Sequence, residues 1–389
     1  MRPEVEAEIL AAFGAPRSDT PKPLADAIDG DVYGSLEIAA RENERIFART
    51  WLPVARVDEL GEPGAFVTET IAGTPVAAVR GEDSQLRVLV NVCRHRGAQI
   101  LRETCGVTEA LRCPYHAFTY SLDGALTACP HPDSLRPEAQ PGKLALPELP
   151  SATWAGWIWT SLDPNAAPLE SFLGPDLLDE LTNWPLAECR TVMRRDVRCD
   201  FDWKIGVEAF LEPYHVPAIH TRSAHPMVDF RGMAIRDLAP HSRMALPFRI
   251  PDAYAPEGIL GAAAHAAGVS WFPTLNRSQQ IAHHVYLIFP CTILMLFPSH
   301  LLVLRFLPAD EVGTCHLRHE LLAAPATSEA SAAWLDSLKP SYEKLVEEDL
   351  ENLPWIQRGA ASGTIHKMEL SSYEARIAMF RQALAALLR

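Results

Sequence analysis

The stretch "NVCRHRGAQILRETCGVTEALRCPYHAF", residues 91–118, constrains the fold more than any other part of this 389-residue chain. It places one cysteine and one histidine in each half, as Cys93-x-His95 and then Cys113-x-x-His116. Thiolate and imidazole are both good ligands for borderline-soft metals. Strand-like segments precede both halves, so the pattern predicts two short loops that offer their ligands to one centre.

The order of these ligands separates two kinds of metal site. A zinc finger groups its cysteines together and its histidines together, whereas here each loop supplies one of each. In a Rieske [2Fe–2S] centre one iron takes two thiolates and the other takes two imidazoles. The pattern therefore favours an iron–sulfur centre, and zinc stays the alternative. The expected ligands are Cys93, His95, Cys113 and His116.

A second group of candidate ligands lies in "DWKIGVEAFLEPYHVPAIH", residues 202–220. Glu212 and His215 are three residues apart and would share one face of a helix. His220 would lie about 140° further round a regular helix, so it joins the same metal only if the helix breaks. The two prolines of this stretch predict that break, because proline lacks the backbone donor. Two imidazoles and one carboxylate form the facial triad that binds non-haem Fe(II).

The third ligand is expected from "SYEKLVEEDLENLPWIQRG", residues 341–359. At helical spacing Asp349 is the one acid on the apolar stripe, whereas Glu347, Glu348 and Glu351 turn away. An unpaired carboxylate on that stripe would be costly, and metal ligation would explain it. We therefore predict Asp349 as the ligand and Glu348 as the substitute, against the simpler reading of a solvated acidic face.

Hydrophobic periodicity predicts the fold class. From Trp51 the period changes to two, and short strands continue to about residue 164, where a proline-rich linker follows. A strand-like stretch at 189–201 and long strands between 282 and 323 come next. Helices are expected at 4–13, 35–48, 203–212, about 328–357 and 370–388. The predicted class is α+β, with a small all-β domain and a domain whose antiparallel sheet packs against long helices.

Composition excludes several classes of protein. The formal net charge of −14 argues against a nucleic-acid or anionic-membrane binder. The most apolar stretch, 285–306, contains prolines, His300 and Arg305, so two strands joined at "FPSH" are expected and not a membrane helix. The N-terminus lacks the pattern of a secretory signal. The eight cysteines predict no disulfide scaffold, which indicates a reducing, cytoplasmic location. The thiols expected to be buried and free are Cys189, Cys199, Cys291 and Cys315.

The motifs "CRHRG…CPYH", "DWK…EAFLEPYHVPAIH" and "EEDLENLPWIQRG" together resemble the catalytic (alpha) subunit of Rieske non-haem iron oxygenases, the aromatic-ring-hydroxylating family, over nearly the whole chain. The resemblance implies N-terminal helices at 1–48, a Rieske domain at 49–165 and a helix-grip catalytic domain at 166–389. It implies a trimer in which each cluster serves the iron of the neighbouring subunit. The compact length favours a homotrimer, and an assembly with a small β-subunit is the alternative. The implied iron ligands are His215, His220 and Asp349.

The resemblance also gives roles to two glutamates. Glu212 matches the carboxylate that bridges a cluster histidine to an iron-ligand histidine across the subunit interface, and so carries electrons without binding iron. Glu208 is expected near the iron ligands. Ala209 stands where asparagine is common, and Ala117 and Phe118 stand where Gly-Trp is common, with consequences that the sequence does not determine.

The resemblance implies O₂ activation at one Fe(II), with electrons supplied through one [2Fe–2S] cluster. Positions 98 and 115, alanine and tyrosine, lack the extra cysteines of respiratory Rieske proteins. No G-x-G-x-x-G follows a strand and no second cysteine quartet exists, so NAD(P)H and flavin are expected on a separate reductase, with or without a ferredoxin.

The expected substrate is a small organic molecule, aromatic by preference, that is mono- or dioxygenated or oxidatively demethylated. A quaternary amine such as choline or a betaine is the alternative. More remote alternatives are a Rieske electron carrier without oxygenase activity and a zinc-stabilised binding protein. Candidate pocket residues, for which ordinary core packing is an equally good explanation, are Trp271, Phe289, Leu294, Met295 and Phe297.

Overall fold

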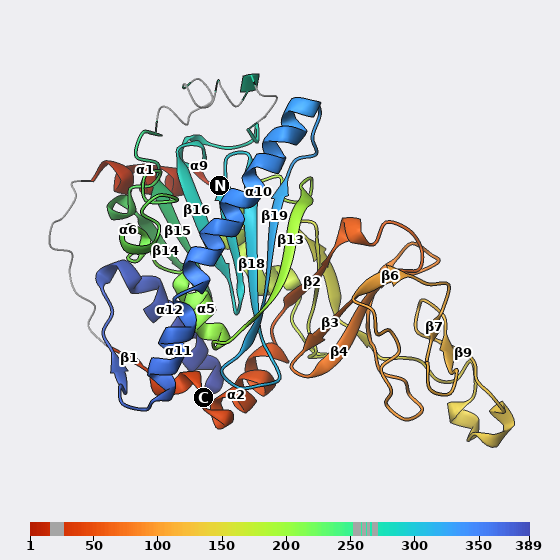
Figure 1. The fold of residues 1–389 in the computed structure, drawn as a ribbon. Coiled ribbons are helices and arrows are strands. Elements are labelled where there is room, and N and C mark those ends of the chain that lie inside the picture. Colours follow the sequence, from red (N-terminus) through yellow and green to blue (C-terminus); the bar gives the residue numbers. More distant parts are fainter. Residues whose placement is uncertain (16–26, 252–257, 259–261, 263–264, 267–270) are drawn as a thin grey trace. The chain divides into compact units, whose positions relative to one another are not determined.

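The computed structural model describes residues 1–15, 27–251, 258, 262, 265–266 and 271–389, which form two compact units (Figure 1). The smaller unit is Asn43–Phe172, and the larger unit combines Met1–Glu42 with Leu173–Arg389. The larger unit is therefore discontinuous in sequence. The functional limits expected from the sequence, 49–165 and 166–389, differ from these by several residues and stay a prediction.

Short antiparallel strands build the smaller unit, as the period-two pattern predicts. They pair in the orders β10-β5-β4-β3-β6, β11-β12-β2 and β7-β8-β9. Both cysteines of the first motif, Cys93 and Cys113, are buried in its apolar core beside Leu89 and Phe118. The strands are β2 (Leu52–Arg56), β3 (Ala65–Ile71), β4 (Thr74–Arg80), β5 (Leu86–Val90), β6 (Cys105–Val107), β7 (Leu111–Arg112), β8 (Thr119–Tyr120), β9 (Leu126–Ala128), β10 (Glu148–Leu149), β11 (Ser151–Trp154) and β12 (Trp157–Thr160).

A seven-stranded antiparallel sheet forms the centre of the larger unit, in the order β13-β19-β18-β17-β16-β15-β14. The expected long strands between 282 and 323 are four of its members, and the "FPSH" turn joins two of them. The strands are β13 (Arg190–Cys199), β14 (Ala234–Leu238), β15 (His241–Pro247), β16 (Ala282–Ile288), β17 (Thr292–Phe297), β18 (His300–Pro308) and β19 (Cys315–Ala323). A two-stranded pair, β1 (Ile28–Asp29) and β20 (Lys367–Met368), completes the unit's strands among the described residues.

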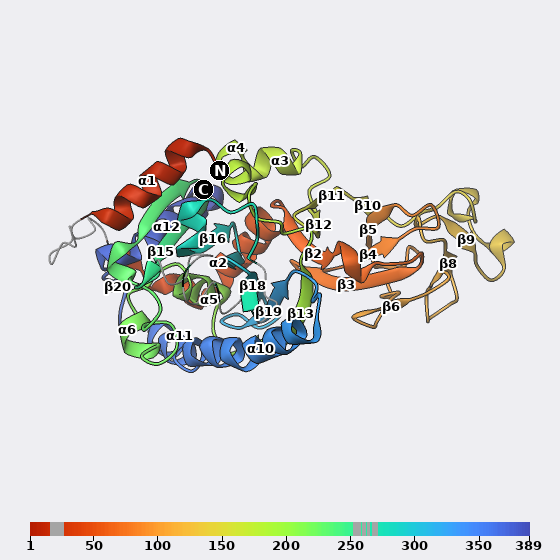
Figure 2. The ribbon, with the colours of Figure 1, turned by 90° about the horizontal axis from the view of Figure 1, so that it is seen from above.

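Helices cover both faces of this sheet, and α10 and α1 lie on opposite sides of it (Figure 2). On the α1 side, Glu180 of α4 pairs with Arg243 at 3.0 Å and accepts a hydrogen bond from Tyr286 at 3.1 Å. The predicted α+β class is confirmed. The helices are α1 (Pro3–Gly14), α2 (Leu36–Glu42), α4 (Pro175–Leu181), α5 (Trp203–Ala209), α6 (Val216–Ile219), α9 (Arg277–Gln280), α10 (Glu329–Leu350), α11 (Leu353–Ala361) and α12 (Ala375–Leu388). The short α3 (Leu169–Leu173) stands at the boundary of the two units.

Two predicted helices end differently from expectation. The helix expected at about 328–357 is two helices, because Pro354 lacks a backbone N–H and favours a new helix start. The helix expected at 35–48 changes at residue 43 from α to a short π-helical segment, Asn43–Phe47.

No helix among the described residues has the length and apolarity to cross a membrane. The eight cysteines, all within the described residues, form no disulfide, and Cys189, Cys199, Cys291 and Cys315 are buried as expected.

The packing of α5 on the sheet generates a prediction. A Cβ atom at Gly206 would lie 2.4 Å from Cδ1 of Phe306 on β18, so no side chain fits there. Gly206→Ala should lower the free energy of unfolding by about 1–3 kcal/mol, measured by equilibrium denaturation. Gly359→Ala on α11 is the matched control, because nothing lies within 4 Å of its Cβ position. The control should be neutral or stabilising by up to about 1 kcal/mol, and equal losses in both variants would contradict the packing argument.

Candidate metal centres

The same backbone hydrogen bonds shape both loops of the cysteine–histidine motif. The N–H of Gly97 donates to the Cys93 carbonyl at 3.0 Å, and the N–H of Ala117 donates to the Cys113 carbonyl at 3.0 Å. In each loop the cysteine N–H donates to the carbonyl five residues on, at 2.8 Å. Gly97 and Ala117 accordingly share a left-handed backbone, with φ of 75° and 56°. The two loops therefore present their ligand side chains in similar ways.

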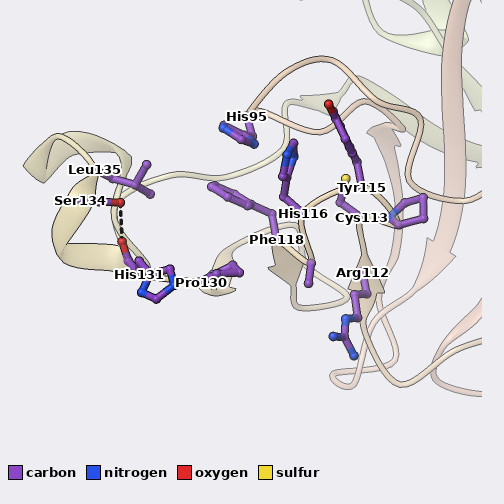
Figure 3. Close-up of a pocket in the computed structure, with 12 residues that line it drawn as sticks. His95, Arg112, Cys113, Tyr115, His116, Phe118, Pro130, His131, Ser134 and Leu135 are labelled. Carbon is purple, nitrogen blue, oxygen red and sulfur yellow. Dashed lines mark hydrogen bonds between the residues drawn. The ribbon is translucent and has the colours of Figure 1, made fainter.

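The side chains of these loops converge. Figure 3 shows His95, His116 and Phe118 at one side of a pocket, and the two imidazole centroids are 4.7 Å apart. Both thiols are buried and free. Nδ1 of His116 is buried without a hydrogen-bond partner among the described residues, which is costly unless a ligand engages it. Two thiols and two imidazoles in this arrangement fit a Rieske cluster.

Tyr120 is a contact of this centre that the sequence did not single out. Its hydroxyl accepts a hydrogen bond from the Arg94 N–H at 3.0 Å and lies 3.4 Å from Sγ of Cys93. Burial raises the pKa of Tyr120, so the phenol stays protonated and can donate to the sulfur. Hydrogen bonds to cluster sulfurs help set the reduction potential. No local motif signals this role, because Tyr120 lies on the strand after the second loop.

In the larger unit His215, His220 and Asp349 bring one donor atom each within 4.8 Å of one another. The expected helix break is present, since α5 ends at Ala209, four residues before Pro213, and the one-turn helix α6 follows. His215 directly precedes α6 and His220 directly follows it.

Neighbouring carboxylates determine which ring nitrogen of each histidine is free to bind a metal ion. Glu212 Oε1 lies 2.6 Å from Nδ1 of His215, and Glu348 Oε2 lies 2.8 Å from Nδ1 of His220. Both Nε2 atoms then face Oδ1 of Asp349, at 3.4 Å and 3.0 Å. Each Nδ1–H can donate to its carboxylate, which leaves both Nε2 lone pairs free for one metal ion.

The electrostatics of this group favour a cation. Burial lowers the pKa of His215 and His220, but the neighbouring carboxylates outweigh burial and raise both values above the ordinary histidine range. Three carboxylates thus stabilise positive charge where the two Nε2 atoms meet. The site fits a divalent metal with two histidines and one carboxylate as ligands.

Several expectations about this region need correction. Glu348 does not turn away, because its carboxylate reaches His220 and accepts a hydrogen bond from Ser223 at 2.5 Å. Pro217 does not break a helix, because it lies in the first turn of α6, where proline is tolerated. Glu208 contacts Tyr33 and Arg381, so it anchors α5 to distant segments, and no hydrogen bond or ion pair among the described residues joins it to the two histidines.

A largely apolar cavity of about 650 Å³ adjoins the three candidate iron ligands. Alternate residues of β15, β16 and β17 line one wall, and α10 forms the opposite wall. Trp271, Met295 and Phe297 line it as expected. Phe289 and Leu294 do not, and both expectations are corrected. Leu294 lies on the opposite face of its strand from Met295, and the ring of Phe289 packs 6.2 Å from that of Phe380.

Family models match both units of the chain. The model of the Rieske [2Fe-2S] domain matches residues 50–148, and that of the ring hydroxylating alpha subunit (catalytic domain) matches residues 186–389, just over half of the chain. The chain belongs to the Rieske non-haem iron oxygenase alpha subunits. The resemblance inferred from the motifs is thereby confirmed.

Individual relatives within this oxygenase family differ in substrate. The chain is 32% identical over 193 residues to the carnitine monooxygenase oxygenase subunit of Acinetobacter pittii (strain PHEA-2), covering 48% of this chain and 51% of the relative. It is 32% identical over 190 residues to the 2-aminobenzenesulfonate 2,3-dioxygenase subunit alpha of an Alcaligenes species, covering 48% of each. The chain thus spans about half the length of the curated relatives it matches.

Solved structures support the fold of this oxygenase subunit. The quaternary ammonium Rieske monooxygenase CntA, in complex with an inhibitor, superposes with a TM-score of 0.78 and 21% identity. The superposition covers 99% of this chain and 98% of that one. At this level of identity the likeness concerns the fold alone.

The unusual alanine of the second cluster loop generates a prediction. Left-handed backbone costs a non-glycine residue about 1–2 kcal/mol, and Ala117 has φ of 56°. Ala117→Gly should therefore stabilise the smaller unit by up to about 1 kcal/mol, seen as a higher denaturation midpoint. Gly97→Ala is the reciprocal control and should destabilise it, although nothing lies within 4 Å of its Cβ position. Effects of the same sign in both variants would refute the argument.

Proposed function

We propose that this chain is the oxygenase component of a system that activates O₂ at a mononuclear Fe(II). One or two oxygen atoms would be inserted into a small organic substrate, or a methyl group removed oxidatively. The supporting observation is that both Nε2 atoms and Asp349 Oδ1 meet at the edge of a largely apolar cavity. Such a cavity excludes water and orients an organic ligand beside the reacting centre.

The chain's own residues have distinct parts in this proposal. Cys93, His95, Cys113 and His116 would hold the [2Fe–2S] cluster, and His215, His220 and Asp349 would hold the iron. When bound, the cluster supplies single electrons and the iron supplies O₂ activation. Glu212 and Glu348 orient the two imidazoles through their Nδ1–H groups.

The proposal includes partners. We infer an NAD(P)H-dependent reductase as electron donor, with or without a ferredoxin, and a homotrimer in which Glu212 links one subunit's cluster to the next subunit's iron. For a quaternary ammonium Rieske monooxygenase of similar fold, inter-subunit electron transfer is described. In this chain Glu212 contacts His215 and its side chain keeps 10% of its surface exposed, so a partner subunit can reach it.

A second candidate function is the monooxygenation of a quaternary ammonium compound. The observation that favours it is the match to the carnitine monooxygenase oxygenase subunit. Aromatic side chains such as Trp271 and Trp334 line the cavity and could attract an ammonium group through cation–π contact.

Metal analysis tests the proposed centres. The purified protein should contain about three irons and two acid-labile sulfides per chain. Asp349→Asn should reduce the iron content to about two, keep the sulfide and the EPR signal of the reduced cluster, and abolish oxygenation. Glu347→Gln, an exposed acid on the same helix, should retain all three irons. Zinc without sulfide, or a third iron that survives Asp349→Asn, would contradict the assignment.

The role of Glu212 is tested by electron transfer. Glu212→Gln should slow reoxidation of the reduced cluster by O₂, in the presence of substrate, by about 10- to 100-fold while the iron is retained. Glu348→Gln is the matched control, because it changes the same kind of hydrogen bond on the other histidine. Equal slowing in both variants would assign Glu212 an orienting role alone.

A further inference from the structure

The cavity wall that faces α10 contains a stack of three parallel rings. The ring of Phe297 lies between His283, at a centroid distance of 4.2 Å and an angle of 12°, and His300, at 4.9 Å and 11°. Because both faces of Phe297 are covered, this ring can offer the cavity only its edge. An aromatic edge carries partial positive charge, which suits the face of another ring or an anion and repels a cation.

The two imidazoles of this stack are neutral. Burial lowers the pKa of His283 and of His300 to about 3, so neither is charged near pH 7. His300 bonds to Ser299 through Nδ1 at 3.0 Å and to the Tyr342 hydroxyl through Nε2. Nε2 of His283 is buried and has no hydrogen-bond partner among the described residues. The stack therefore contributes polar edges and no charge.

Two cationic side chains, those of Arg222 and Lys344, also line the cavity. Both are exposed, and no ion pair of Arg222 occurs among the described residues. Ser223, next to Arg222, donates to Glu348, and Lys344 lies one turn before Glu348 on α10. The two cations thus come from segments that are joined at Glu348.

Negative charge is scarce in the same lining. Among the described lining residues, the carboxylates are Glu212 and Asp349, and both belong to the candidate iron site. Glu348, close to the cations, is engaged by His220 and Ser223. A bound ammonium group would therefore meet two cations and find no free carboxylate, in a chain whose net charge is −14.

We propose that the cavity takes an aromatic carboxylate, with its ring against the His283–Phe297–His300 edges and its carboxylate toward Arg222 and Lys344. This inference rests on the proposed function in taking the cavity as the substrate site. A volume of about 650 Å³ suits a ligand of one or two rings. The two cations would each form a charge-assisted hydrogen bond with the carboxylate.

The test is calorimetric titration of the iron-loaded enzyme without O₂, using three probes of matched shape. These are 2-naphthoate, the neutral 2-naphthamide, and (2-naphthylmethyl)trimethylammonium. Naphthoate should bind at least about tenfold tighter than the amide, and the ammonium probe should bind weakest. Tighter binding of the ammonium probe than of naphthoate would overturn the proposal.

Variants assign the preference to residues. Arg222→Gln with Lys344→Gln should weaken naphthoate binding by tenfold or more and leave the amide within about twofold. Lys339→Gln is the control, since Lys339 is on the same helix, pairs with Asp336 and does not line the cavity. Equal weakening of both probes, or none, would overturn the proposal. So would a naphthoate preference that survives the double variant and disappears with the iron in Asp349→Asn, because the carboxylate would then bind the metal.

The outcomes separate this inference from the proposed function. Anaerobic binding requires no turnover, so naphthoate selectivity without any O₂ consumption in the complete electron-transfer system would support the ligand class and contradict the oxygenase. Oxygenation of the ammonium probe, with weak naphthoate binding, would support the oxygenase and contradict the proposed ligand class.

Discussion

Two neighbouring acids of helix α10 hold both ring nitrogens of His220, and the geometry of the larger unit's candidate site depends on this contact. Oε2 of Glu348 lies 2.8 Å from Nδ1, and Oδ1 of Asp349 lies 3.0 Å from Nε2. Consecutive residues of a helix point about 100° apart, so the imidazole must enter between them. Asp349 also faces Nε2 of His215, which joins both histidines to α10.

The same contact shapes the cavity. Because Glu348 also accepts a hydrogen bond from Ser223, the segment after His220 is held against α10, and the cavity opens between that segment, the helix and the sheet. The charge-bearing edge near Arg222 and Lys344 is a consequence of this junction. The metal site and the ligand selectivity that we propose thus depend on one set of hydrogen bonds.

Helix α5, which leads into the site, is held by buried charges from both ends of the chain. Lys204 lies 2.8 Å from both Glu42 and Asp202, and Glu208 pairs with Arg381 of α12. Burial raises the pKa of Glu208, and the Arg381 guanidinium opposes that rise. Loss of one partner in such a group typically costs about 3–5 kcal/mol, because the remaining charge stays buried. These contacts make the site sensitive to residues far from it in sequence.

Features that depend on neighbours a few residues apart could be predicted from the sequence. The Cys-x-His and Cys-x-x-His spacings, the alternation of the strands between 282 and 323, and the helical stripe that singled out Asp349 are all local patterns. They sufficed for the fold class and the family. Tertiary packing was needed to show that Glu348 reaches His220, that Glu208 pairs with Arg381 of α12, and that Leu294 faces away from the cavity. These outcomes depend on how distant segments pack, since a side chain's partner across a sheet or a helix leaves no periodic signal in its own stretch of chain.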